Sequence, residues 1–506
     1  MPMTISTLHR IVLAIMFASA LSTASAQDAP KDRAQPNAVE RHEAGKGILR
    51  LLPADAVTDH SIDTARGKLA YTATAGTLAF YDQSGDQSAS VFYTAYVAKN
   101  AAPNRPLTFV FNGGPGAASA FLHLGLVGPR ILDFGADGHD AARASLRDNP
   151  ETWLAFTDLV LIDPIGTGWS RAVKGDDAKH FWSVRSDADA MAKAISLYVA
   201  NNNRAGSPKY LFGESYGGFR AAKVGRALQT DQGITIAGIV MLSPLLEGWL
   251  TFGDDSSALH AALQLPSLAA AELERKHTFT PDAQAAAEKF AMTDYLVTLA
   301  GPQPKGEAAS TFYGRVAQMT GLPLDAVTQA RGFAANAYVK TLRSADSKIV
   351  SRYDATFAVD DPYPERRSSR APDPILDALS RAYGGAMASY ARNELGFKTE
   401  MTYALLAGDV TGHWDWQGGR VQASAEDDLR VLLAYGPSFR LMIAHGYSDM
   451  ITPYAMTHYI LDHMPAFDPP GRVQRKLYRG GHMLYIDPES RKAFTADAAS
   501  FYRPAE

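Results

Sequence analysis

The chain has 506 residues, of which 46% are hydrophobic and 20% charged, so it can bury a large core. Its net charge of −4 provides no basic surface for nucleic acid or for anionic membranes. Because cysteine is absent, disulfides, thiolate metal sites and cysteine nucleophiles are excluded together.

The first 26 residues have the pattern of a cleaved secretory signal peptide. Arg10 precedes an apolar run over residues 11–21, and the small residues that follow end in an Ala-x-Ala site at Ala26. The run is too short for a permanent helix across a bilayer, so we expect no stable membrane anchor. We predict cleavage after Ala26 and a periplasmic or secreted protein that begins with a polar N-terminal arm over residues 27–66.

Residues 67–247 have the pattern of an α/β domain. Residues 68–81 and 89–98 alternate polar and apolar side chains, which predicts two antiparallel strands. Apolar runs follow over residues 106–111, 158–162, 210–212 and 234–242, and residues 181–199 carry helical spacing. Strands that are apolar throughout, with helices between them, predict a mostly parallel sheet covered by helices on both faces.

The pattern changes to helical segments with polar faces over residues 248–430, for example at residues 281–290 and 373–393. Strand patterns return at residues 439–444 and 475–478, and a last helix is predicted over residues 490–502. Residues 431–506 therefore complete the sheet domain. The intervening block is predicted to be a helical insertion that forms a lid over the strand ends.

The segment Gly213-Glu214-Ser215-Tyr216-Gly217-Gly218 lies between an apolar run and a helical stretch. Small residues on both sides of a serine allow the sharp strand-to-helix turn that exposes a nucleophilic hydroxyl. The simpler alternative is an ordinary glycine turn. The position between strand and helix favours Ser215 as a nucleophile.

An activated serine needs a base, and the base needs a group that orients it. Asp449 and His482 each follow a late predicted strand, in the order that this chemistry requires. Asp449 could instead cap the helix predicted to start near Thr452, and His482 could be a histidine of a surface loop. His445 is a weaker candidate for the base because it precedes the acid.

A loop with the sequence Asn112-Gly113-Gly114-Pro115-Gly116 follows an early strand. Backbone amides from such a loop, together with the amide of Tyr216, can stabilise the oxyanion of acyl transfer. The loop is also close to a dinucleotide-binding fingerprint, but it lacks the third glycine and Pro115 removes an amide. We therefore expect no nucleotide cofactor.

Five segments, in order, resemble the signature blocks of the serine carboxypeptidase family, which has the α/β-hydrolase fold. They are Asn112-Gly113-Gly114-Pro115-Gly116, Asp163-Pro164-Ile165-Gly166-Thr167-Gly168-Trp169-Ser170, Gly213-Glu214-Ser215-Tyr216-Gly217-Gly218, Gly446-Tyr447-Ser448-Asp449 and Gly481-His482-Met483. The resemblance implies a triad of Ser215, Asp449 and His482, with the oxyanion amides at Gly114 and Tyr216. It implies neither a cofactor nor a metal.

The resemblance also implies a site for the free C-terminal carboxylate of a peptide. Asn112 would donate from its side chain, Gly113 from its backbone, and Glu214 would take part as a protonated carboxyl group. The family has a second acid in a Glu-x-Gly-Pro segment, and here Leu126 takes its place. The lack of cysteine also differs from disulfide-bonded eukaryotic members and suggests a bacterial branch.

We therefore predict an exported serine-type carboxypeptidase whose partner is the C-terminus of a peptide or protein. The oligomeric state is left open. The replacement at Leu126 leaves two alternatives, an esterase or an aminopeptidase of the same fold. A further alternative is a secreted binding protein that has lost its chemistry. In the insertion, Trp414 and Trp416 either line the pocket or pack the lid onto the body, whereas His413 and Asp415 are a weak metal pair.

Overall fold

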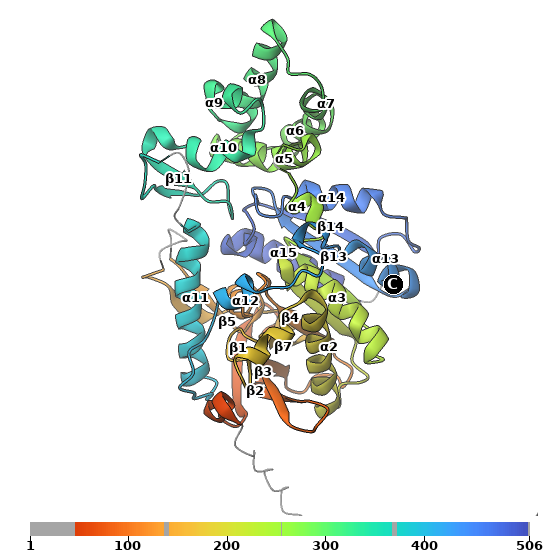
Figure 1. Cartoon of the computed structure of the whole chain (residues 1–506). Coiled ribbons are helices and arrows are strands. Elements are labelled where there is room, and N and C mark those ends of the chain that lie inside the picture. The colour runs from red at the N-terminus through yellow and green to blue at the C-terminus, as the bar shows by residue number, and fades with distance from the viewer. Residues whose placement is uncertain (1–45, 136–140, 255, 367–371, 504–506) are drawn as a thin grey trace, which may run out of the picture. The chain divides into compact units, whose positions relative to one another are not determined.

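The computed structural model describes residues 46–135, 141–254, 256–366 and 372–503, so the predicted signal peptide and residues 27–45 of the predicted arm lie outside the described residues. Residues 44–506 belong to one compact unit. Among the described residues, ten strands form one mixed sheet in the order β1-β2-β3-β7-β4-β9-β10-β13-β14, with β8 beside β3 (Figure 1).

The bounds of these strands are β1 (Ala56–Thr64), β2 (Gly67–Tyr81), β3 (Gln87–Ala98), β4 (Leu107–Phe111), β7 (Asp158–Ile162), β8 (Arg171–Ala172), β9 (Lys209–Glu214), β10 (Gly238–Leu242), β13 (Arg440–Gly446) and β14 (Val473–Tyr478). The pairs from β1 to β7 are antiparallel, and those from β7 to β14 are parallel. The predicted mixed, mostly parallel sheet is confirmed. The apolar run at residues 234–242 becomes a strand only from Gly238 onward.

Both faces of the sheet are buried, which explains why its parallel strands are apolar throughout. Phe109 and Phe111 pack in the core formed with helices α2 (Val184–Asn201) and α3 (Tyr216–Asp231). Val110 lies in the core of the other face, with α11 (Pro374–Asn393) and α15 (Pro488–Phe501). Burying each side chain of this size stabilises the fold by about 1.5–3 kcal/mol, so the strand pattern is specified by packing on two sides.

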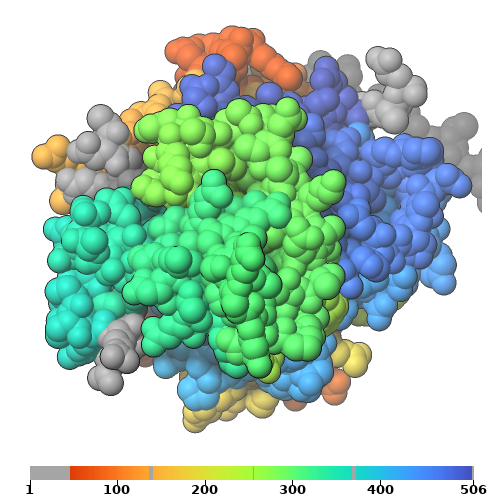
Figure 2. All heavy atoms as spheres, turned by 90° about the horizontal axis from the view of Figure 1, so that it is seen from above, coloured from red at the N-terminus to blue at the C-terminus, as the bar shows by residue number. Residues whose placement is uncertain are grey.

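Part of the predicted insertion has a core of its own. Residues between Ala261 and Ala355 form a separate apolar cluster, which joins helices α5 to α10. Figure 2 shows the face of the molecule on which this part of the chain lies. The helices are α5 (Ala258–Arg275), α6 (Pro281–Phe290), α7 (Leu296–Ala300), α8 (Gly306–Thr320), α9 (Leu324–Gln329) and α10 (Ala334–Thr341).

The remaining elements connect these parts. They include α1 (Ala120–Leu122), η2 (His123–Val127), β5 (Arg130–Asp133), β6 (Ser145–Asp148), α4 (Gly248–Thr251), β11 (Lys348–Val350), β12 (Ala358–Asp360), α12 (Gly408–Gly412), α13 (Glu426–Tyr435), α14 (Tyr454–His463) and η8 (Leu484–Ile486). Within the described ranges, no helix is both long and apolar enough to cross a membrane.

Two segments belong to the sheet although they lie within other predicted parts. Helix α11 and the segment after it, from the predicted insertion over residues 248–430, pack in the core of the sheet. Strand β1, from the predicted arm over residues 27–66, pairs with β2 along residues 56–64. In β1 only Ile62 is buried, so this edge strand carries almost no apolar pattern that sequence reasoning could detect.

Candidate active site

Ser215 lies at the sharp turn between β9 and α3. Its backbone has φ 61° and ψ −127°, a region that costs about 1–3 kcal/mol for a residue with a side chain. The Ser215 amide donates to the Leu242 carbonyl at 2.9 Å, which holds the turn against the next strand. A Cβ atom on Gly213 would lie 1.9 Å from the Gly217 carbonyl oxygen, so a glycine is required for the turn to close. The turn therefore has the geometry of a nucleophile elbow.

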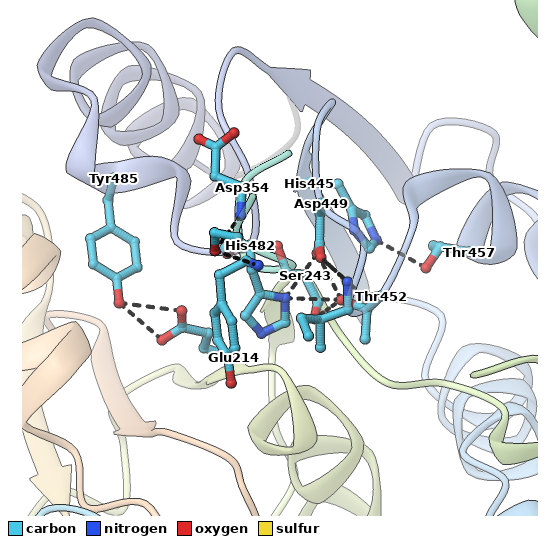
Figure 3. A network of polar contacts seen from close by, with 12 residues as sticks. Glu214, Ser243, Asp354, His445, Asp449, Thr452, Thr457, His482 and Tyr485 are labelled. Carbon is cyan, nitrogen blue, oxygen red and sulfur yellow. Dashed lines mark hydrogen bonds and ion pairs between the residues drawn. The ribbon is translucent and has the colours of Figure 1, made fainter. Parts of the chain in front are cut away.

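His482 and Asp449, which follow β14 and β13, are brought into contact. His482 Nδ1 lies 2.8 Å from Asp449 Oδ2, and both side chains are buried (Figure 3). Asp449 Oδ1 accepts hydrogen bonds from the amides of Ile451 at 2.7 Å and Thr452 at 3.1 Å. Helix α14 begins only at Tyr454, so these bonds form a turn and do not cap the helix.

Asp449 and His482 each stabilise the charged form of the other. Burial disfavours the ionised form of Asp449, but the neighbouring His482 and the hydrogen bonds outweigh it, so the pKa of Asp449 is lowered. Burial likewise disfavours the imidazolium form of His482, but the charge and hydrogen bond of Asp449 outweigh it, and the pKa of His482 is raised. Asp449 is thus kept as an anion that can orient and stabilise the imidazole.

Thr452 is a polar neighbour of this pair that sequence reasoning missed. Its hydroxyl lies 2.9 Å from Asp449 Oδ2 and 3.1 Å from His482 Nδ1. It also lies 2.9 Å from the carbonyl oxygen of Ser243 at the end of β10. The only hint of this role in the sequence is that Thr452 comes three residues after Asp449. That spacing predicts a contact with His482 only once the fold has brought His482 beside Asp449.

His445, the weaker candidate for the base, has another environment. It is buried on β13, and its Nε2 lies 2.9 Å from the hydroxyl of Thr457 (Figure 3). Burial lowers the pKa of His445 to about 3, so it is a neutral histidine of the core.

A cavity of about 600 Å³ brings the predicted site residues together. Its mostly apolar walls include Phe252, Tyr353, Leu376 and Leu406, all from the block predicted as the insertion. The site residues in its lining are Asn112, Gly113, Gly114, Glu214, Ser215, Tyr216 and His482. His482 Nε2 makes no hydrogen bond to another described residue, so this nitrogen is available to take the proton of Ser215.

The two predicted oxyanion segments lie next to each other. Strand β4 pairs with β9 so that Phe111 is opposite Gly213, which places the loop after β4 beside the elbow. Tyr216 is the first residue of α3, where amides have no partner within the helix. Neither this amide nor that of Gly114 donates to another group in the described part of the chain. Both are available to stabilise an oxyanion.

Glu214 is 4% exposed and lies beside Ser215. Asn112 donates to its Oε2 through Nδ2, and the hydroxyl of Tyr485 lies 3.2 Å from both carboxyl oxygens (Figure 3). Burial raises the pKa of Glu214 to about 7, although His482, Tyr485 and Asn112 act in the opposite direction. Glu214 therefore has a donor that sequence reasoning missed, because nothing near Tyr485 in the chain marks it as a partner.

The two tryptophans of the segment after α12 pack against the elbow. The rings of Trp414 and Trp416 meet the ring of Tyr216 edge-on, with centroids 5.3 and 5.5 Å away. Neither tryptophan lines the cavity, which supports the packing interpretation. Their neighbours have local partners: His413 Nδ1 lies 2.9 Å from the Asp409 carbonyl oxygen, and Asp415 accepts from an amide two residues on.

Comparisons with known proteins identify a family for this chain. The family model described as serine carboxypeptidase matches residues 69–468. Retinoid-inducible serine carboxypeptidase of Homo sapiens is 32% identical over 148 residues, 28% of this chain and 30% of the human protein. Pheromone-processing carboxypeptidase KEX1 of Yarrowia lipolytica is 29% identical over 165 residues, 32% of this chain and 24% of that protein. The chain thus matches less than a third of the length of these two relatives.

A solved structure shows the same fold. The prohormone-processing carboxypeptidase KEX1(Δ)p from Saccharomyces cerevisiae superimposes with a TM-score of 0.53 at 13% identity, covering 85% of this chain and 91% of that one. The fold is therefore the α/β-hydrolase fold, with a mixed, mostly parallel sheet. Since the family model covers most of the chain, the protein belongs to the serine carboxypeptidase family.

Proposed function

We propose that the protein is an exported serine-type carboxypeptidase that releases C-terminal residues from peptides. The observation that carries this proposal is the buried pair of Glu214 and Asn112 beside Ser215 in one cavity. A protonated carboxyl group and an amide are donors suited to a carboxylate. Glu214 directly precedes the nucleophile in the chain and Asn112 contacts Glu214. Both lie where the free end of a peptide would be during attack on its last peptide bond.

The proposed reaction proceeds through an acyl-enzyme. Ser215 Oγ attacks the carbonyl carbon while His482 Nε2 takes its proton, and the amides of Gly114 and Tyr216 stabilise the oxyanion. The peptide bond then breaks as His482 gives the proton to the leaving amine. Water, deprotonated by His482, attacks the ester, and the proton returns to Ser215 Oγ. Asp449 keeps the imidazole in the required tautomer throughout.

The protein without residues 1–26 tests this proposal. We expect it to release free amino acids from N-terminally blocked dipeptides, and to release none from the same dipeptides with an amidated C-terminus. Ser215→Ala is the control, and it should lower kcat by about 10⁴-fold or more while the fold is retained. A fluorophosphonate should label Ser215 in the wild type; folded protein that does not label would instead be a binding protein.

A second candidate is an esterase or an aminopeptidase of the same fold. The mostly apolar lining of the cavity and the replacement of the family acid by Leu126 favour it. Hydrolysis of short acyl esters, together with no release from any blocked dipeptide, would select the esterase. Release from unblocked N-termini would select the aminopeptidase.

Export is a separate part of the proposal and depends on the sequence pattern of residues 1–26. The intact mass of the protein recovered outside the cytoplasm should correspond to a chain that begins at Gln27. A mass that retains the first 26 residues would contradict it. A bacterial origin, which the absence of cysteine suggests, stays a prediction.

A further inference from the structure

Tyr485 holds the buried carboxyl group of Glu214. It lies on η8, three residues after His482, and is 1% exposed. Its hydroxyl is equidistant from the two oxygens of Glu214, at 3.2 Å from each. Tyr485 does not line the cavity, so it contacts Glu214 from the protein interior and not from the substrate side.

The chain makes room for this tyrosine at the segment where the family has its second acid. A Cβ atom on Gly125 would lie 2.6 Å from Cε2 of Tyr485 and 2.7 Å from the hydroxyl of Tyr383. The next residue, Leu126, is fully buried in the apolar core and carries no acid. Tyr485 therefore fits only because Gly125 has no side chain. It donates to Glu214 in a chain that has leucine, and no acid, at position 126.

The other titratable groups around Glu214 do not replace the missing acid. Asp449 is the other carboxylate that acts on Glu214, and it is engaged with His482. The pKa values of Tyr353, in the β11–β12 connection, and of Tyr383, on α11, are raised by burial and also by the charge of Glu214, so both stay neutral phenols.

Two cations reach the backbone of this site, and both have partners. Arg220 donates to the carbonyl of Asn112 and pairs with Asp187. Arg491 donates to the carbonyl of Tyr485 and pairs with Glu151. One carboxyl group, that of Glu214, is thus left to bind a substrate carboxylate.

We propose that Tyr485 is the positioning residue of the carboxylate site, holding Glu214 in place of a second acid so that a single carboxyl group controls recognition of the peptide C-terminus. This inference rests on the proposed function. Glu214 can donate to a substrate carboxylate only while it is protonated. The Tyr485 hydroxyl remains a donor at all pH values of interest, because burial raises its pKa well above the usual 10.

The proposal predicts the pH dependence of peptide release. For a free-carboxylate peptide, log kcat/KM should fall on the alkaline side with a slope of −1, because one group titrates. Tyr485→Phe removes a donor that favours ionised Glu214. The midpoint of this fall should therefore move to higher pH, by about one unit for a hydrogen bond to a charged group. A short acyl ester has no carboxylate to bind, so the alkaline fall governed by Glu214 should be absent from its pH profile in both the wild type and Tyr485→Phe.

The experiment compares wild type, Tyr485→Phe and Tyr383→Phe on both substrates between pH 5 and 9. Tyr383→Phe is the matched control: it removes a neighbouring buried hydroxyl that makes no hydrogen bond to Glu214, and its profile should match the wild type. In a Glu214→Gln background, Tyr485→Phe should no longer move the midpoint. If Tyr485→Phe does not fold, site-specific 3-fluorotyrosine at position 485 provides a stronger donor and should move the midpoint to lower pH.

The outcomes separate the two proposals. If the wild type releases residues from peptides and Tyr485→Phe leaves the midpoint unchanged, or Tyr383→Phe moves it equally, the role of Tyr485 is overturned and the carboxypeptidase remains. An alkaline slope of −2 would also overturn it, because two carboxyl groups would then titrate. If the wild type hydrolyses the ester but no peptide at any pH, the proposed function fails and the carboxylate site fails with it.

Discussion

Two buried carboxyl groups in this site, Asp449 and Glu214, have opposite pKa shifts. Burial disfavours ionisation of both. Asp449 also has a histidine partner, two backbone amides and a hydroxyl, so its pKa is lowered. Glu214 has an amide and a phenol as donors, which compensate burial only in part. The environment of each residue, not its type, separates a permanent anion from a group that can carry a proton near neutrality.

The raised pKa of Glu214 predicts how stability depends on pH. Its value of about 7 in the folded chain lies above the usual 4.5, so its contribution to stability is complete below about pH 4.5 and is lost as pH rises through 7. The loss amounts to about 3 kcal/mol. Glu214→Gln should remove this loss, measured as the free energy of unfolding in urea at pH 5 and pH 8.

The matched control for this measurement is Glu307→Gln, at an exposed position in the first turn of α8. It should show the same decrease between the two pH values as the wild type. If Glu214→Gln also lost as much stability as the wild type, Glu214 would be ionised in the folded protein at both pH values.

Among the elements, the short connection between β11 and β12 holds the two loops that carry Asp449 and His482. The Tyr353 carbonyl accepts from the amide of His482 at 2.6 Å, and the Arg352 carbonyl accepts from the amide of Met450 at 3.1 Å. The Ala355 amide donates to the carbonyl of Ser448 at 3.0 Å. Because the loops carrying Asp449 and His482 are attached to one segment, their separation is set by backbone hydrogen bonds.

The side chain of Tyr353 also supports the base. Its ring meets that of His482 edge-on, with centroids 5.2 Å apart and planes at 84°. Such a contact contributes about 0.5–1.5 kcal/mol, so Tyr353→Ala should lower kcat for a short acyl ester by up to about ten-fold. Tyr353→Phe keeps the ring and should stay close to the wild type in the same steady-state assay. Equal losses in both variants would assign the effect to the hydroxyl and contradict the ring contact.

For the whole molecule, the helices of the insertion attach to the body through a buried polar cluster on α14. The Tyr454 hydroxyl donates to Glu288 at 2.5 Å and accepts from Gln284 Nε2 at 2.6 Å. Gln284 is 2% exposed and its Oε1 already has no partner among the described residues. Tyr454 is five residues after Asp449, so this attachment links the position of the insertion to the loop that carries Asp449.

Removing the hydroxyl should loosen this attachment. Tyr454→Phe leaves buried Gln284 with one partner fewer, which costs about 1–3 kcal/mol of unfolding free energy. We expect this loss in urea unfolding at pH 7. Tyr447→Phe, whose ring contacts that of Tyr454 at 5.6 Å, is the control and should be close to neutral. Equal stability of Tyr454→Phe and the wild type would show that the cluster does not hold the insertion.

The α/β architecture and the candidates Ser215, Asp449 and His482 can be predicted from the order of the amino acids alone. Strand periodicity, a glycine turn and a position at the end of a strand are local patterns, so they can be detected without a structure. Strand β1 could not be predicted in this way, because it buries only one side chain. Nor could the packing of α11, which lies against the sheet and is not part of the core of the insertion.

The surroundings of Glu214 and the segments that line the cavity follow from the packing of distant parts of the chain. Tyr485 and Glu214 are 271 residues apart in the chain, and a contact over that distance leaves no periodic or spacing signal. The same holds for Tyr353, which reaches His482 from within the insertion. The proposed chemistry of the site is specified by local turns, whereas the proposed recognition of a peptide C-terminus depends on side chains that meet only because the sheet and its insertion pack together.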